Sequence, residues 1–171
     1  MPSIIIYASK HGATKAYAEW LSAELDIPAY SIETFKVADI QKARNVIIGS
    51  AIYMAHLRIA DWLQDNWHHL REKNIALYSV SGTDPTDPAL DKMIEDSLAS
   101  NILDKMKVFH FPGRIDRKKL DWWERFILDL AMRFEKNPEK KKKFMDGQSK
   151  LEQGSIETLE NWLESSDCQS A

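Results

Sequence analysis

The sequence has little of what several protein classes require. Cys168 is its only cysteine among 171 residues, so neither an internal disulfide nor a thiolate metal cage can form, and we expect an exposed, unreactive thiol. No apolar run approaches the roughly 18 residues of a membrane-spanning helix. Residues 1–6 lack the basic flank and small-residue cleavage site of a signal peptide, which leads us to expect a cytoplasmic protein.

Several nucleotide and phosphate motifs are also missing. The chain has six glycines, but none falls into the triphosphate pattern G-x-x-x-x-G-K-[ST] or the dinucleotide pattern G-x-G-x-x-G. The acidic residues that a phosphoacceptor receiver needs after its first and third strands are replaced by Ala8-Ser9 and Gly49-Ser50. His68 and His69 lack ligand spacing, so we expect no metal site.

Composition fits one ordinary globular domain, with 44% hydrophobic and 29% charged residues. We assign residues 1–165 to this domain and 166–171 to a frayed tail. The net charge of −3 is unevenly spread, because residues 114–143 hold eleven Lys and Arg against six Asp and Glu. This basic segment favours an anionic partner, such as a membrane face, an acidic protein or a charged ligand, rather than nucleic acid; a merely solvated loop is the alternative.

Short apolar runs alternate with amphipathic stretches along the chain. The runs that predict strands are Ile4–Ala8, Ala29–Ile32, Val46–Ser50, Ile75–Val80 and Met106–Phe111. The helical patterns cover Thr14–Leu25, Ile59–Leu70, Asp87–Ile102 and a final stretch from Ser155 to Leu163. Strands alternating with helices predict right-handed βαβ units, so the fold class is α/β with a parallel sheet covered on both faces.

Ligands of open parallel sheets bind outside the carboxyl ends of the strands, which directs attention to the loops there. The loop after the first strand combines hydroxyls, a glycine and a helix N-terminus, a combination suited to a phosphate dianion. Its residues are Ser9, Lys10, His11, Gly12, Ala13 and Thr14. An ordinary N-cap turn is the alternative interpretation.

Two further loops complete a candidate ligand site. The loop after the third strand is apolar and aromatic, whereas the loop after the fourth is small and polar. Together they could hold a flat heteroaromatic ring between stacking and hydrogen-bonding surfaces, although Tyr53 could equally be a half-buried loop aromatic. The candidate residues are Ser50, Ala51, Ile52 and Tyr53 in one loop and Ser81, Gly82, Thr83 and Asp84 in the other.

These motifs resemble those of the flavodoxin-like FMN-binding domains. The resemblance is carried by Ser9-x-His11-Gly12-x-Thr14, Gly49-Ser50-Ala51-Ile52-Tyr53 and Tyr78-Ser79-Val80-Ser81-Gly82. It implies a doubly wound sandwich with a five-stranded parallel sheet of order 2-1-3-4-5. It also implies FMN, with the phosphate at residues 9–14, the ring between the other two loops, and no catalytic side chain because the flavin performs the redox step.

Within that family the chain is most similar to the menaquinone-dependent protoporphyrinogen dehydrogenases. The likeness rests on a helical, basic and aromatic insert at about residues 112–146, between the fifth strand and the last helix. Its tryptophans could contact a membrane surface, cover a hydrophobic substrate such as a quinone or porphyrinogen, or pack on the protein core. The candidate contact residues are Arg114, Trp122, Trp123 and Phe126.

Three hypotheses about function follow. The first is an FMN-dependent oxidoreductase or electron-transfer protein with a redox partner. The second is a quinone-linked dehydrogenase of protoporphyrinogen or a related hydrophobic donor, with contact at the inner face of the membrane. The third is an interaction module that has lost its cofactor, against which the retention of Ser9, Gly12, Thr14 and Gly82 argues.

Overall fold

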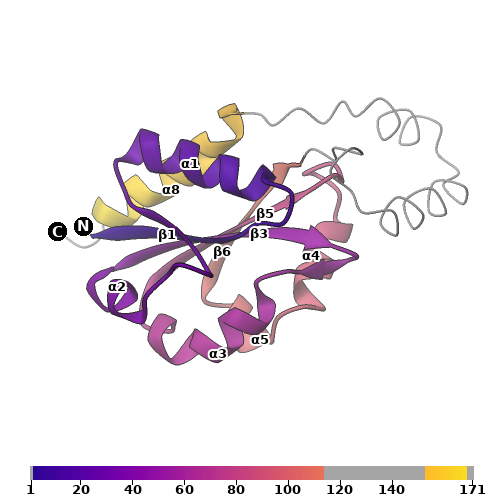
Figure 1. Ribbon diagram of the computed structural model, residues 1–171. Helices are drawn as coiled ribbons and strands as arrows, with labels where there is room; N and C mark the ends of the chain where they lie inside the picture. Colours follow the sequence, from indigo (N-terminus) through magenta and orange to yellow (C-terminus); the bar gives the residue numbers. More distant parts are fainter. Residues whose placement is uncertain (1, 114–152, 169–171) are drawn as a thin grey trace, which may run out of the picture.

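The computed structural model describes residues 2–113 and 153–168. Within these residues a parallel sheet runs in the order β2-β1-β3-β5-β6 (Figure 1). Its strands are β1 (Ser3–Ala8), β2 (Ala29–Ser31), β3 (Asn45–Tyr53), β5 (Asn74–Ser81) and β6 (Met106–Pro112). The short strand β4 (His56–Leu57) pairs antiparallel with the end of β3. The predicted α/β fold and the predicted strand order 2-1-3-4-5 are confirmed. The short strand β4 was not predicted, and it shifts the numbers of the last two parallel strands to β5 and β6.

Helices connect consecutive strands of this sheet and follow the last one. The connecting helices are α1 (Ala13–Leu25), α2 (Val37–Lys42), α3 (Ala60–Leu70), α4 (Ala89–Glu95) and α5 (Ser100–Leu103). After the undescribed segment come a 3₁₀ turn (Gln153–Ile156) and α8 (Glu157–Cys168). The last helix therefore continues to Cys168, past the point where the sequence predicted a frayed tail from residue 166.

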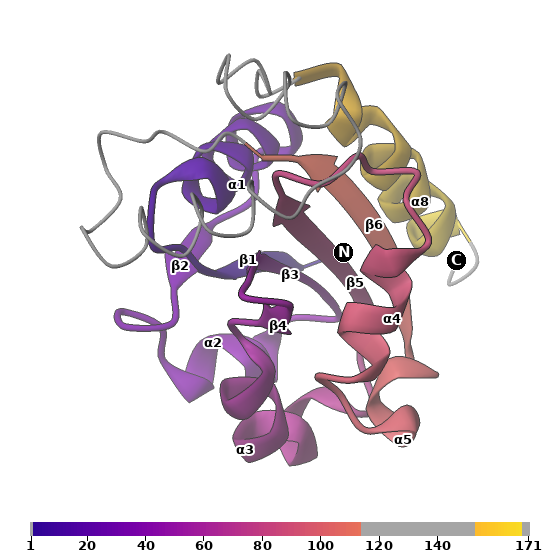
Figure 2. The same ribbon diagram turned by 90° about the vertical axis from the view of Figure 1, so that its right-hand side faces the viewer.

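The sheet separates two hydrophobic layers, because alternate side chains of each strand point to opposite faces. On one face Tyr17 and Leu21 of α1 pack with Leu159 of α8. On the other face helices α2, α3 and α4 pack on the sheet, for example through Leu63 and Ile94. Figure 2 shows α1 and α8 on one side of the sheet and α2, α3 and α5 on the other.

The structure corrects the predicted helix over residues 87–102. It ends as α4 at Glu95, and α5 begins at Ser100. The Ser97 hydroxyl donates to the Met93 carbonyl at 2.6 Å, and serine side chains that bond to the backbone in this way compete with continued helix. Ala99 then adopts an extended conformation, which completes the break.

The apolar loop predicted after the third strand is wrong in its boundaries. Residues 50–53 belong to β3, which ends at Tyr53. Tyr53 pairs with His56 across a two-residue turn. Both turn residues, Met54 and Ala55, have positive φ (50° and 61°). Type I′ hairpin turns require that combination but normally use Asn and Gly, so the sequence carried no turn signal here.

Candidate functional site

The loop between β1 and α1 is built around the Ser9 side chain. The Ser9 hydroxyl oxygen accepts hydrogen bonds from the backbone N–H groups of Gly12 at 3.2 Å and Lys15 at 3.4 Å. Ser9 therefore folds the loop back over the first turn of α1. The predicted loop residues 9–14 are thus brought together at the carboxyl edge of the sheet, where the first strand ends.

Gly12 gives this loop its shape. It is the N-cap of α1 and has φ 93°, a left-handed conformation that only glycine adopts without strain. Among the described residues, a Cβ at this position would meet no atom within 4 Å, so this part of the structure leaves the loop open on the side of Gly12. The first turn of α1 contains no acidic residue. An open glycine turn at the positive end of a helix, free of carboxylates, fits a phosphate group.

Thr14 is anchored from beneath by the sheet. Its carbonyl accepts a hydrogen bond of 3.0 Å from the Tyr78 hydroxyl, and the residue is only 1% exposed. Tyr78 reaches it by crossing over Gly49 of β3, where a Cβ would overlap the phenol ring. Glycine at position 49 is therefore a condition for the contact between β5 and the start of α1.

The end of β3 places Tyr53, the predicted ring contact, at the carboxyl edge of the sheet. The Lys10 ammonium lies 4.6 Å from the centroid of the Tyr53 ring, so the loop after β1 and the end of β3 meet. Tyr53 is half-buried and offers an aromatic face for a flat ligand. The predicted phosphate loop and the predicted ring contact are thus adjacent.

The other three predicted residues of this segment contribute less directly. Ser50 is fully buried, and its hydroxyl accepts from the Ile59 N–H and donates to the Ala51 carbonyl, both at 3.1 Å. Ile52 packs against the core on the α2–α3 face. Ser50 and Ile52 therefore fix the strand end, while Ala51 is half-buried beside them.

The loop after β5 is organised by its own side chains. The Ser81 hydroxyl accepts from the Thr83 N–H at 3.1 Å, and Asp84 accepts from both the N–H and the hydroxyl of Thr86, at 3.0 and 2.7 Å. Gly82 and Thr83 lie half-buried between them. These local hydrogen bonds fix the conformation of the loop. A loop that is already ordered can form the small polar wall of a ligand site.

Sequence reasoning missed two residues that close the carboxyl edge. The Gly113 N–H donates to the Ser81 carbonyl, and a Cβ on Gly113 would lie 2.7 Å from that oxygen. The second is Tyr17, whose hydroxyl donates to the Pro112 carbonyl at 2.8 Å. The only available signal was the Pro-Gly pair at the end of a predicted strand. Both contacts hold the end of β6 beside the candidate site.

The remaining site predictions fall on the insert. Arg114, Trp122, Trp123 and Phe126 lie outside the described residues. Of the insert predicted at about residues 112–146, Pro112 ends β6 and Gly113 follows it. Within residues 2–113 and 153–168 no helix is long and apolar enough to cross a membrane.

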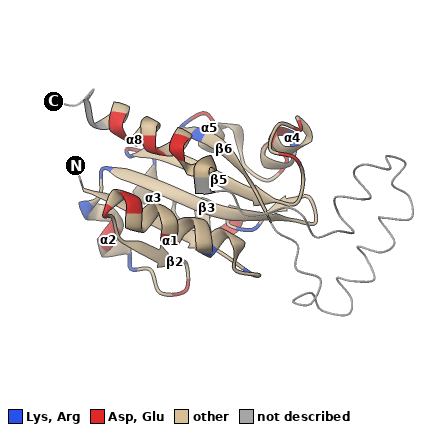
Figure 3. Cartoon of the chain, turned by 90° about the horizontal axis from the view of Figure 1, so that it is seen from above, with Lys and Arg blue, Asp and Glu red and all other residues tan. Residues whose placement is uncertain are grey.

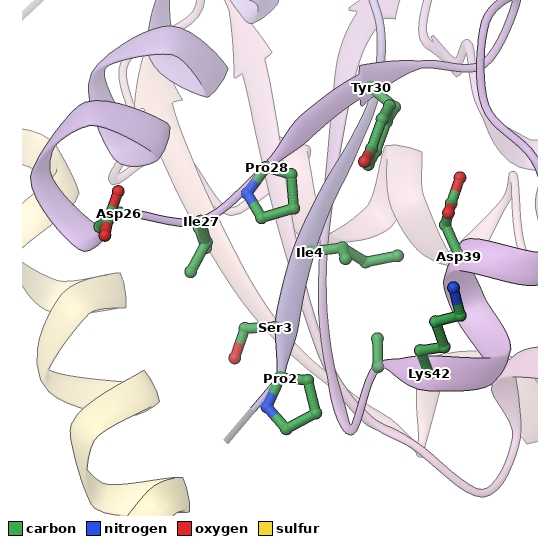
Figure 4. Close-up of a pocket in the computed structure, with 10 residues that line it drawn as sticks. Pro2, Ser3, Ile4, Asp26, Ile27, Pro28, Tyr30, Asp39 and Lys42 are labelled. Atoms are coloured by element: carbon green, nitrogen blue, oxygen red, sulfur yellow. The ribbon is translucent and has the colours of Figure 1, made fainter.

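A hollow of about 360 Å³ lies at the opposite end of the sheet. Its wall includes the start of β1, the chain entering β2, and α2. Figure 4 shows Tyr30, Asp39 and Lys42 around the side chain of Ile4. Because this hollow is at the amino ends of the strands, it is separate from the predicted ligand site.

The outer surface of α8 is acidic. Figure 3 shows acidic positions on α8 and α1, which share one face of the sheet. Burial raises the pKa of the Glu160 carboxyl, and the neighbouring carboxylates of Glu24, Glu157 and Glu164 raise it further. The Glu160 Oε1 atom is buried, and no group in residues 2–113 and 153–168 donates a hydrogen bond to it.

Comparison with known proteins identifies the family. The profile described as a flavodoxin domain matches residues 4–142. The chain belongs to the flavodoxin family. No curated protein matches it, and the solved structures similar to this flavodoxin domain are distant in sequence. The three described next are below 20% identity, so they bear on the fold alone.

Three of the similar structures are covered over nearly their full length. The Trp repressor binding protein from Bacillus subtilis has 16% identity and a TM-score of 0.50, with 79% of this chain and 99% of that chain covered. Oxidised flavodoxin 2 from Bacillus cereus has 16% identity and a TM-score of 0.48, covering 78% and 100%. A flavodoxin from the domain Archaea has 19% identity and a TM-score of 0.45, covering 78% and 98%.

Proposed function

We propose that this flavodoxin-family protein binds FMN and works as an oxidoreductase or electron-transfer protein. One observation carries the proposal: the open Gly12 turn at the start of α1 meets the Tyr53 ring through Lys10. A phosphate-sized anion and a flat ring thus have neighbouring places at the carboxyl edge of a parallel sheet. FMN combines those two groups in one molecule, which is also what the family suggests.

The residues have separate roles in this proposal. The backbone N–H groups at the start of α1 would hold the phosphate, which would take the place of the Ser9 hydroxyl as acceptor for Gly12 and Lys15. The hydroxyls of Ser9 and Thr14 would lie beside it. Tyr53 would cover one side of the ring, and the backbone of residues 81–84 would meet its polar edge. Bound flavin supplies the electron or hydride chemistry, whereas these protein groups bind it, orient it and limit the access of water.

The test is whether the purified protein retains flavin. The protein is incubated with excess FMN and desalted, and its visible absorption and flavin fluorescence are recorded. A retained two-band spectrum with quenched fluorescence supports the proposal. A colourless protein contradicts it and favours the cofactor-free interaction module.

We further propose a hydrophobic electron donor or acceptor, with a quinone and a porphyrinogen as the substrates to test first. The segment at 114–143 favours this choice because its sequence is aromatic as well as basic, with Trp122 and Trp123 side by side. It also follows Gly113, whose N–H donates to the Ser81 carbonyl of the candidate ring site. The chain therefore enters that segment at the carboxyl edge of the sheet. Oxidation of protoporphyrinogen by the FMN-loaded protein with a quinone present tests this substrate. Activity with other donors only would contradict it.

We also propose that the basic segment at 114–143 contacts an anionic membrane surface, which binding to anionic liposomes tests. Sedimentation with the liposomes at low salt, and release as salt rises, is the behaviour of a basic interfacial segment. Sedimentation that does not depend on lipid charge would contradict an electrostatic contact.

A further inference from the structure

Ser97 joins helix α4 to the hairpin formed by β3 and β4. Ser97 is 6% exposed, and its hydroxyl oxygen accepts a hydrogen bond of 2.9 Å from the Leu57 N–H. The same hydroxyl donates its proton to the Met93 carbonyl at 2.6 Å. His56 Nδ1 lies 3.3 Å from this oxygen and must be the donor there, since the single serine proton is already engaged. One hydroxyl thus links the end of α4 to both residues of β4.

The hairpin needs such an external support. Its turn residues Met54 and Ala55 both have positive φ, a conformation that disfavours residues with a Cβ. The strand β4 that follows has only two residues, so few ladder bonds oppose this strain. Tyr53, the proposed ring contact, directly precedes the turn. Its position therefore depends on what holds the hairpin in place.

The first turn of α4 is tied to the other wall of the site. Asp91 accepts a hydrogen bond of 3.0 Å from His110 Nε2, and His110 Nδ1 lies 2.7 Å from the hydroxyl of Ser79. Ser79 is on β5, two residues before Ser81, where the 81–84 loop begins. Helix α4 is thus hydrogen bonded to the hairpin at one end and, through His110, to the base of the polar loop at the other.

We propose that α4 is a brace that sets the spacing between the hairpin and the 81–84 loop, with Ser97 as its positioning residue for the flat ring. The inference rests on the proposed function, because the ring it positions is that of FMN. Figures 1 and 2 show α4 beside the sheet near the end of β3, as a brace between these segments requires. Asp91 holds the other end of the same helix.

The test compares two flavins that differ only in the phosphate. Ser97→Ala is titrated with FMN and with riboflavin, and Ser100→Ala, an exposed serine of α5, is the control. Loss of the Ser97 hydroxyl should weaken both flavins by the same factor, about three- to tenfold, the worth of one hydrogen bond. Asp91→Ala, at an exposed helix position, should do likewise, whereas Asp91→Asn keeps an acceptor for His110 and should bind as the wild type does.

Combining the two substitutions distinguishes a brace from two contacts, of Ser97 and of Asp91, that act independently. If one intact helix carries both contacts, the double variant Ser97→Ala/Asp91→Ala loses less affinity than the product of the two single losses. Multiplicative losses, or a loss confined to FMN, would overturn the brace.

A measurement without flavin completes the test. The Leu57 amide should exchange its proton faster in Ser97→Ala than in the wild type, with the amides of β1 unchanged. Unchanged Leu57 exchange would overturn the proposed link. A wild-type protein that binds neither flavin would refute the proposed function and the ring-positioning role with it, whereas a wild type that binds both and a Ser97→Ala variant that binds equally well would overturn the brace alone.

Discussion

The hydroxyl of Tyr78 donates a hydrogen bond of 3.0 Å to the carbonyl of Thr14, which ties strand β5 to the first turn of α1. Both residues are buried. The contact supports the turn proposed to hold phosphate, because Thr14 is two residues beyond Gly12. Substitution at this contact therefore affects both stability and ligand binding.

Tyr78→Phe should lower the free energy of unfolding by about 1 kcal/mol, because it removes the buried hydrogen bond from the phenol to the Thr14 carbonyl. Chemical denaturation measures this change. Tyr30→Phe removes a hydroxyl from a half-buried tyrosine of β2 and is the matched control, with little expected change. Equal stability of Tyr78→Phe and the wild type would show that the bond contributes nothing.

Alkaline pH should destabilise the protein through the same tyrosine. Burial raises the pKa of Tyr78 well above its usual value of 10.0, and the neighbouring Tyr7 raises it further. The folded state therefore keeps a proton that the unfolded state loses, so this contribution to stability is complete below pH 10.0 and declines as the pH rises above it. Denaturation at a series of pH values should show a shallower alkaline decline for Tyr78→Phe than for the wild type.

Ala13→Asp tests the phosphate site by adding a charge at a half-buried position. A carboxylate in the first turn of α1 favours the helix but repels a phosphate dianion, so FMN should bind at least about tenfold more weakly. Riboflavin, which has no phosphate, should bind as before. Ala13→Asn has nearly the same shape without the charge and is the control. Equal losses for both flavins would place the phosphate elsewhere.

Glu160→Gln should stabilise the protein at neutral pH. The raised pKa of the Glu160 carboxyl means that its contribution is fully present below the usual value of 4.5 and is lost as pH rises through the folded pKa. Relief of repulsion from neighbouring carboxylates on α8 is worth about 0.5 kcal/mol, a rise in Tm of about 1–2 °C at pH 7. The gain should vanish at pH 4. Glu95→Gln on α4, an exposed position, should change Tm little at either pH.

The sequence predicted the fold well where strands are buried on both faces. The runs Ile4–Ala8 and Ile75–Val80 lie within β1 and β5, because continuous apolar runs of this length suit the centre of a parallel sheet. Helix α2 escaped prediction, since its six residues bury only Ile40 and leave no periodic pattern to find. Short elements depend on contacts that a single sequence does not display.

The candidate site was predictable in its residue types but not in its supports. Gly12 and Ser9 stand in one loop, so their motif is visible in the sequence. The contacts of Tyr78 with Thr14 and of Ser97 with Leu57 join segments 64 and 40 residues apart. The hairpin after Tyr53 was missed for a different reason, because Met54 and Ala55 are not turn-forming residues.

Parallel titration of the purified protein with FMN and with riboflavin tests the central claim most directly. The account predicts that FMN is retained after desalting with its two-band spectrum, and that riboflavin binds more weakly because it lacks the phosphate that the Gly12 turn would hold. A protein that remains colourless after incubation with FMN would contradict the account.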